Sequence, residues 1–147
     1  MIQFLRKFFV YFSGSTDRGE PLPERVADDE SLCRFIFSDK MFSSINRRVK
    51  HHAFSPKGNE VSVFRTVSLE QDDIWKMGQL QAGGARGNPR ARADLLTRAV
   101  RKARLNVLSA PKSHPRHANI VDWPAEKELQ QRAKMELASA STLVLPE

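Results

Sequence analysis

The chain has 147 residues, a common length for one folded domain, and its 24 lysine and arginine residues against 17 acidic residues give a formal net charge of +7. Hydrophobic residues at 40% and charged residues at 28% exclude a wholly disordered chain and a typical integral membrane protein. The single cysteine, Cys33, excludes an internal disulfide and zinc sites built from paired cysteines. We therefore expect a cytoplasmic protein with one hydrophobic core.

The N-terminal segment MIQFLRKFFVYF is apolar but carries Arg6 and Lys7. Its uninterrupted apolar run at residues 8–12 is shorter than the roughly 18 residues of a spanning helix or the roughly 7 to 15 of a signal core, so we expect no transmembrane segment. Three interpretations stay open: an element packed on the domain, an amphipathic segment at a membrane interface, or a non-native extension from an upstream start codon.

Residues 13–30 contain two glycines, two prolines and six acidic residues without a sustained apolar period, which is typical of a linker. We therefore divide the chain into two parts. Residues 1–30 are an apolar strip and an acidic Pro/Gly linker, partly disordered, and residues 31–147 are a single compact α+β domain.

The first half of this domain has a strand and turn pattern. Two β-like runs, RVKHHAF and EVSVFRTV, flank the turn residues Pro56 and Gly58, which predicts a hairpin between residues 48–54 and 60–67. The preceding SLCRFIFS is a candidate third strand. Within the second run Arg65 shares a face with two valines, so it lies at a sheet edge or has a partner.

The second half alternates helices, strands and loops. Ser68 and Gln71 fit a capping box, which predicts a helix from Ser68 that ends near Gly78. A basic Gly-rich loop follows at residues 82–92, then a helix at 93–104 whose apolar residues recur at three- and four-residue steps. We expect a strand at 105–108, a loop, a last helix from Pro124 and a closing strand at 143–145. The predicted fold is α+β or mixed α/β, a small antiparallel-containing sheet with about three helices packed on it.

Charge is unevenly distributed along the chain. Residues 83–104 hold seven cations and one acid, and residues 31–67 hold seven cations and two acids. Two positive regions on a small domain attract a polyanion, and nucleic acid is the commonest such partner. Arginine's planar fork suits phosphate oxygens. The candidate nucleic-acid-binding residues are Arg86, Arg90, Arg92, Arg98, Arg101 and Lys102. The alternative is a solvated basic helix face beside a flexible connector.

A second candidate is the segment HPRHANIVDW, residues 114–123, between a predicted strand and a predicted helix. There His117 is a candidate general acid or base, Arg116 an anion-binding group, Asn119 a substrate-orienting group and Asp122 the partner that holds the imidazole tautomer. No spacing in the chain matches a nucleophile elbow, a phosphate loop or a metalloprotease helix. In the structural alternative, His117 hydrogen-bonds the backbone, Asn119 caps a turn and Trp123 packs in the core.

We expect neither a cofactor nor a metal site. His114 and His117 are spaced by three residues, but adjacent His51 and His52 would point to opposite faces of a strand, while zinc needs three or four converging ligands. Cys33 has apolar neighbours, which favour a buried, inert thiol over a nucleophile.

Three functions therefore remain as hypotheses, and binding is favoured over catalysis. The first is a basic domain that contacts DNA, RNA or another polyanion through the Arg-rich loop and helix. The second is an accessory subunit that docks on a larger protein. The third is a small enzyme that acts on an anionic substrate through residues 114–123. The sequence leaves the oligomeric state open.

Overall fold

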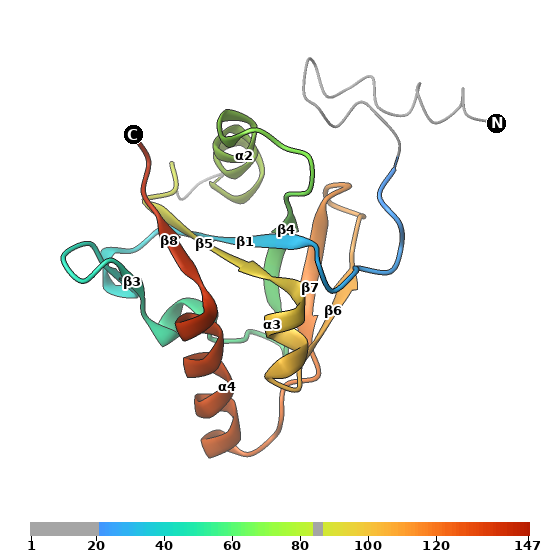
Figure 1. Ribbon diagram of the computed structural model, residues 1–147, viewed down its shortest axis with the longest axis vertical. Coiled ribbons are helices and arrows are strands. Elements are labelled where there is room, and N and C mark those ends of the chain that lie inside the picture. The colour runs from blue at the N-terminus through green and yellow to red at the C-terminus, as the bar shows by residue number, and fades with distance from the viewer. Residues whose placement is uncertain (1–20, 84–86) are drawn as a thin grey trace.

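The computed structural model describes residues 21–83 and 87–147 and has the predicted α+β architecture (Figure 1). In these residues six strands form one sheet and two short strands form another. The strands are β1 (Ser31–Ile36), β2 (Phe42–Ser43), β3 (Arg48–Val49), β4 (Val61–Arg65), β5 (Ala91–Leu96), β6 (Asn106–Ser109), β7 (His117–Val121) and β8 (Thr142–Val144). The helices are α2 (Gln71–Met77), α3 (Thr97–Lys102) and α4 (Lys127–Ala140), with 3-10 turns η3 (Asp39–Met41) and η4 (His51–Phe54) and a π-helical turn η5 (Gly78–Gly83).

The large sheet has the strand order β6-β7-β4-β1-β5-β8, and every neighbouring pair in it is antiparallel. Strand β1 pairs with β5 from Ser31 opposite Leu96 to Ile36 opposite Ala91. Helix α2 lies on one side of the sheet, and helices α3 and α4 lie on the other (Figure 1). Both faces of the sheet therefore carry helices.

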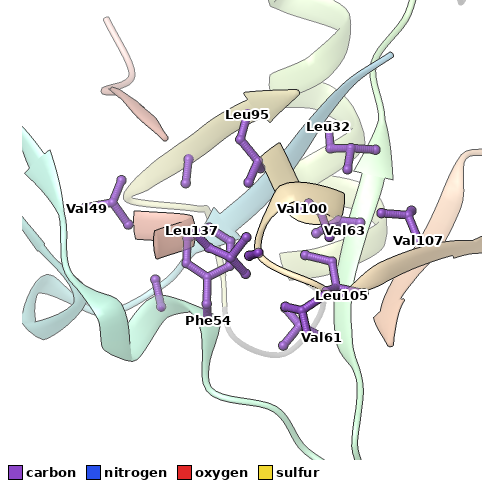
Figure 2. Packing of buried hydrophobic residues seen from close by; sticks show 14 of the residues in the cluster. Leu32, Val49, Phe54, Val61, Val63, Leu95, Val100, Leu105, Val107 and Leu137 are labelled. Atoms are coloured by element: carbon purple, nitrogen blue, oxygen red, sulfur yellow. The ribbon is translucent and has the colours of Figure 1, made fainter. Parts of the chain in front are cut away.

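The larger hydrophobic cluster lies on the face that carries α3 and α4. Side chains alternate between the two faces along a strand, so Leu32 and Ile36 of β1 point to this cluster. Leu137 of α4 is completely buried and lies beside Phe54 of η4 (Figure 2). Burial of such side chains removes apolar surface from water, which is the main term that stabilises the fold.

The smaller cluster lies on the face that carries α2. It consists of Cys33, Phe35, Phe64, Ile74 and Met77. The Phe35 and Phe64 rings have centroids 5.7 Å apart, so the sheet offers α2 an aromatic surface.

The predicted partner of strand β4 is wrong. β4 pairs with β1 and β7 instead of with the predicted hairpin partner, residues 48–54. His51–Phe54 of that predicted partner form the 3-10 turn η4. This turn buries both Ala53 and Phe54, whereas successive residues of a strand would point to opposite faces. The chain does reverse at the predicted position, because Gly58 and Asn59 have φ of 59° and 64° and Lys57 and Glu60 exchange backbone hydrogen bonds.

The predicted start of the helix at residues 68–78 is also wrong, whereas its predicted end near Gly78 is confirmed, because α2 ends at Met77. Ser68 has φ 66° and is not the cap, and α2 begins after Glu70 without a side-chain capping bond. Gly78 keeps a helical φ of −61° and leads into η5. A Cβ at Gly78 would lie 2.5 Å from Cε1 of Phe35, so glycine serves close packing on the sheet here.

Residues 93–104 form a strand and a helix instead of the single predicted helix. Ala91, Ala93 and Leu95 of β5 point to the larger cluster and pair along β1. Helix α3 begins only at Thr97, whose backbone N–H and hydroxyl both donate to the carbonyl of Glu30 at 2.9 and 3.0 Å. Cross-strand pairing with β1 therefore overrides the helical spacing of the apolar residues.

The segment predicted as a loop before the last helix contains strand β7. Its residues pair with both β4 and β6, with Ile120 opposite Val61 and Val107. The strand predicted at 105–108 and the closing strand are present as β6 and β8. The last helix is present as α4, but it begins at Lys127 and not at Pro124. The stretch 21–30, predicted as linker, supplies Val26 to the larger cluster and Glu30 as a buried partner of Arg65.

Within the described ranges, no helix combines the length and the apolar character needed to cross a bilayer.

Candidate functional site

A cleft of about 840 Å³ lies along the edge strand β6 and carries three arginines. Arg101 comes from the last turn of α3, Arg104 from the residues that follow it, and Arg25 from the segment that leads to β1. Two carboxylates, Glu24 and Asp122, also line it. The remaining lining residues are Val26, Leu105, Asn106, Val107, Leu108 and Ser109. We refer to this cleft, lined by these residues, as the basic cleft.

The positive charges around the basic cleft act on one carboxylate. A hydrogen bond from Arg101, together with the charges of Arg25 and Arg98, holds the pKa of Asp28 below its ordinary value. Arg101 Nε also donates to Asn106 Oδ1 at 3.1 Å, which ties the end of α3 to the edge strand. Arg101 is therefore held in place, while Arg25 and Arg104 are exposed.

The backbone at Arg104 is unusual. Helix α3 ends in a Schellman arrangement, in which the N–H of Arg104 bonds to the carbonyl of Arg101 and the N–H of Leu105 bonds to the carbonyl of Val100. The residue at this position is commonly glycine because it needs a left-handed conformation, and Arg104 has φ 68°. The chain thus has a long, positively charged side chain at a position where glycine would have the lowest backbone conformational energy.

The predicted nucleic-acid-binding residues are divided between several places. Arg98 and Lys102 are exposed on α3, and Arg101 lines the basic cleft. Arg90 is exposed, and its Nη1 lies 3.3 Å from Oδ1 of Asp39 in an ion pair. Arg86 lies outside the described residues. Arg25 and Arg104 were not predicted as site residues. Arg104 belongs to the same basic run as the predicted cations, and Arg25 lies in the predicted linker.

Arg92 differs from the other predicted cations because its side chain is buried in the protein. It is 1% exposed, forms two hydrogen bonds with Asp94 at 2.9 and 3.1 Å, and also donates to Gln71. Its guanidinium lies 4.9 Å from the Trp75 ring centroid. Since it lies under α2, this guanidinium is not part of an exposed binding surface.

A serine and a histidine form a second candidate site on neighbouring strands. Ser62 Oγ of β4 lies 2.7 Å from His117 Nε2 of β7, and His117 Nδ1 lies 3.0 Å from the carbonyl oxygen of Ala110. A carbonyl only accepts, so the neutral imidazole carries its proton on Nδ1 and Nε2 accepts the Ser62 hydroxyl proton. Asn119 lies opposite Ser62 in the register and therefore shares its face of the sheet.

The four predicted catalytic residues lie in three different places. His117 and Asn119 are two residues apart on β7, on one face, and both are half-buried. Arg116 is buried and donates to the backbone carbonyls of Arg65 and Val67, both at 2.9 Å. Asp122, beyond the far end of β7, lines the basic cleft. The carbonyl of Ala110, not Asp122, is thus the group that orients His117.

In residues 21–83 and 87–147, no group of three or more histidine, cysteine or acidic side chains is arranged to hold a metal ion.

Cys33 is fully buried, and this burial raises the pKa of its thiol far above the ordinary value. The thiolate that a nucleophile or metal ligand needs is therefore disfavoured at Cys33. The apolar N-terminal strip, which with the basic loop would be a contact surface in the docking hypothesis, lies outside the described residues.

Comparison with known proteins adds no relative: no family model, no curated protein and no solved structure matches the chain.

Proposed function

We propose that the protein binds nucleic acid through phosphate contacts made at the basic cleft. The observation that carries this proposal is the convergence of Arg25, Arg101 and Arg104 on one open cleft. Arg98 lies nearby, because its N–H donates to the carbonyl of Asp28, whose carboxylate accepts from Arg101. Arginine donates two parallel hydrogen bonds to phosphate oxygens, and such contacts supply sequence-independent affinity by releasing counterions.

The conformation of Arg104 supports a functional role for this residue. A residue held in the left-handed region costs of order 1 kcal/mol relative to glycine, and such costs concentrate at functional sites. The backbone conformation of Arg104 therefore does not stabilise the fold relative to glycine. A contact to phosphate gives a reason for a cation in this position.

The test is the Arg104→Gly variant, because it separates binding from folding. We expect this variant to be more stable than the parent by about 1 kcal/mol, since glycine relieves the left-handed strain. We also expect weaker binding of a fluorescein-labelled oligonucleotide, measured by anisotropy on the single strand and on its duplex. Each lost phosphate contact lowers the slope of log Kd against log salt by about one.

The matched control is Arg132→Gln, which removes one positive charge from an exposed position on α4. This control keeps the parent's salt slope if the basic cleft makes the contacts. An equal loss of affinity in both variants would assign the binding to net charge alone. Absence of binding by the parent at physiological salt would reject the proposed function.

A further inference from the structure

The Ser62 and His117 pair has the geometry of an activated hydroxyl. The hydroxyl and the imidazole Nε2 are 2.7 Å apart, and the carbonyl of Ala110 at 3.0 Å from Nδ1 fixes the tautomer in which Nε2 takes up a proton. In nucleophilic serine sites a third group orients the histidine, and here a backbone oxygen has this position. The hydrogen bonds of His117 with the Ser62 hydroxyl and with the Ala110 carbonyl are both made to uncharged groups.

Both side chains are held by the sheet. β4 and β7 are neighbouring inner strands, and Val61, Ser62, Val63 and Phe64 pair in register with Ile120, Asn119, Ala118 and His117. The Phe64 and His117 rings have centroids 5.5 Å apart, which restricts the imidazole on one side. Sites on strands keep their geometry better than sites on loops, so the base and the hydroxyl are preorganised.

The same sheet face offers a hydrogen-bond donor and an apolar surface. Asn119 is the direct cross-strand neighbour of Ser62, so its amide lies in reach of an oxygen bound at the hydroxyl. On the other edge of β7, Leu108 of β6 is the register partner of Asn119 and is 53% exposed. A small acyl group attached at Ser62 would thus have a polar donor and an exposed leucine beside it.

We infer that Ser62 is a nucleophile, His117 its general base and Asn119 an oxyanion donor in the hydrolysis of small carboxylic esters. Ser62 Oγ attacks the ester carbonyl carbon while its proton moves to His117 Nε2. The C–O bond to the alcohol then breaks, and the alcohol leaves with that proton. Water attacks the acyl-serine, gives a proton to His117, and releases the acid as the proton returns to Ser62.

This activity uses other polar residues than the proposed nucleic-acid binding, although Leu108 borders both sites. The pair lies on β4 and β7, whereas the cations of the basic cleft come from α3, the residues after it and the segment before β1. Catalysis at Ser62 and binding at the cleft can therefore be tested separately.

The test uses a fluorophosphonate probe on the full chain, followed by peptide mapping. Ser62 Oγ displaces fluoride from phosphorus, and the hydroxyl proton passes through His117 to solvent. We expect the label on Ser62, no label in Ser62→Ala, and labelling slowed by about 100-fold or more in His117→Gln. Asn119→Ala slows it by about 100-fold as well, because one oxyanion donor is lost.

The matched controls are Ser139→Ala on α4 and His52→Gln, both at exposed positions, which leave labelling unchanged. Thermal unfolding of each variant verifies the fold, and mapping of the label on the unmodified chain needs no variant. Hydrolysis of 4-nitrophenyl acetate by the parent, lost in Ser62→Ala, is the second expected result. No label, a label on another residue, undiminished labelling of His117→Gln, or no ester turnover overturns the inference.

Discussion

A buried arginine is tolerated in a protein when acceptors receive its donors, and Arg65 meets this condition through one carboxylate. Its Nε and Nη2 donate to the two oxygens of Glu30 at 2.8 and 2.7 Å, and its side chain is 1% exposed. Burial alone raises the pKa of Glu30, but the hydrogen bonds from Arg65 and the N–H of Ala27 outweigh it and hold that pKa below its ordinary value.

This depressed pKa predicts a pH dependence of stability. The stabilisation from charged Glu30 is present above the ordinary glutamate value of 4.5 and is lost as the pH falls through the lower folded value. Glu30→Gln lowers the free energy of unfolding near neutral pH, by about 3 kcal/mol for a buried charge left without its counterion. The variant also loses less stability than the parent on acidification. Urea unfolding of both proteins between about pH 7 and pH 3 measures this, and parallel profiles would contradict it.

At the scale of elements, helix α2 depends on one glycine for its contact with the sheet. Gly78 at its end faces the Phe35 ring, and a Cβ there would meet three ring atoms at 2.5 to 2.9 Å. Ring atoms of Phe35 are themselves packed against Phe64 and Trp75, with centroids at 5.7 and 6.4 Å. The ring therefore has little room to move away.

We predict that Gly78→Ala destabilises the protein by about 1–3 kcal/mol through overpacking. In an unobstructed helix the same change stabilises by roughly 0.5–1 kcal/mol, so the sign of the effect tests the contact. Gln79→Ala, at the exposed neighbouring position, is the control and should change stability little. In the double variant Phe35→Leu with Gly78→Ala, the cost of the alanine becomes smaller. Chemical denaturation of the parent, Gly78→Ala, Phe35→Leu, the double variant and Gln79→Ala gives the five free energies that this comparison needs.

At the scale of the whole molecule, α4 joins distant parts of the chain into one core. It packs on η4, β3, β5 and α3, elements that precede it by many residues. Leu137 is its fully buried contact in the larger cluster (Figure 2). Loss of this side chain should therefore weaken the structure as a unit.

Leu137→Ala is expected to lower the free energy of unfolding by about 2–5 kcal/mol, from lost apolar burial and a remaining cavity. Met135→Ala removes a side chain that is 54% exposed on the same helix, and it should cost little. Tryptophan fluorescence and far-UV circular dichroism should report the same transition in denaturant. A similar cost for both variants would mean that α4 is not packed as described.

Much of the local structure was predictable because it depends on neighbours in sequence. The turn at Gly58 and Asn59, strand β4, the last helix and the closing strand follow from turn chemistry and periodicity. His117 and Asn119 were recognised as chemically capable residues. Their partner Ser62 was not, because it lies 55 residues earlier in the chain and no spacing rule connects the two.

The sequence by itself determined the α+β class, the excess of positive charge and the residue types available for chemistry. Only the tertiary structure decided which of them meet. Pairing with β1 made residues 91–96 a strand and so placed Arg92 under α2. Pairing with β4 made residues 117–121 a strand and brought His117 to Ser62. The physical reason is that strand pairing joins residues distant in sequence, so local propensity and spacing do not encode it.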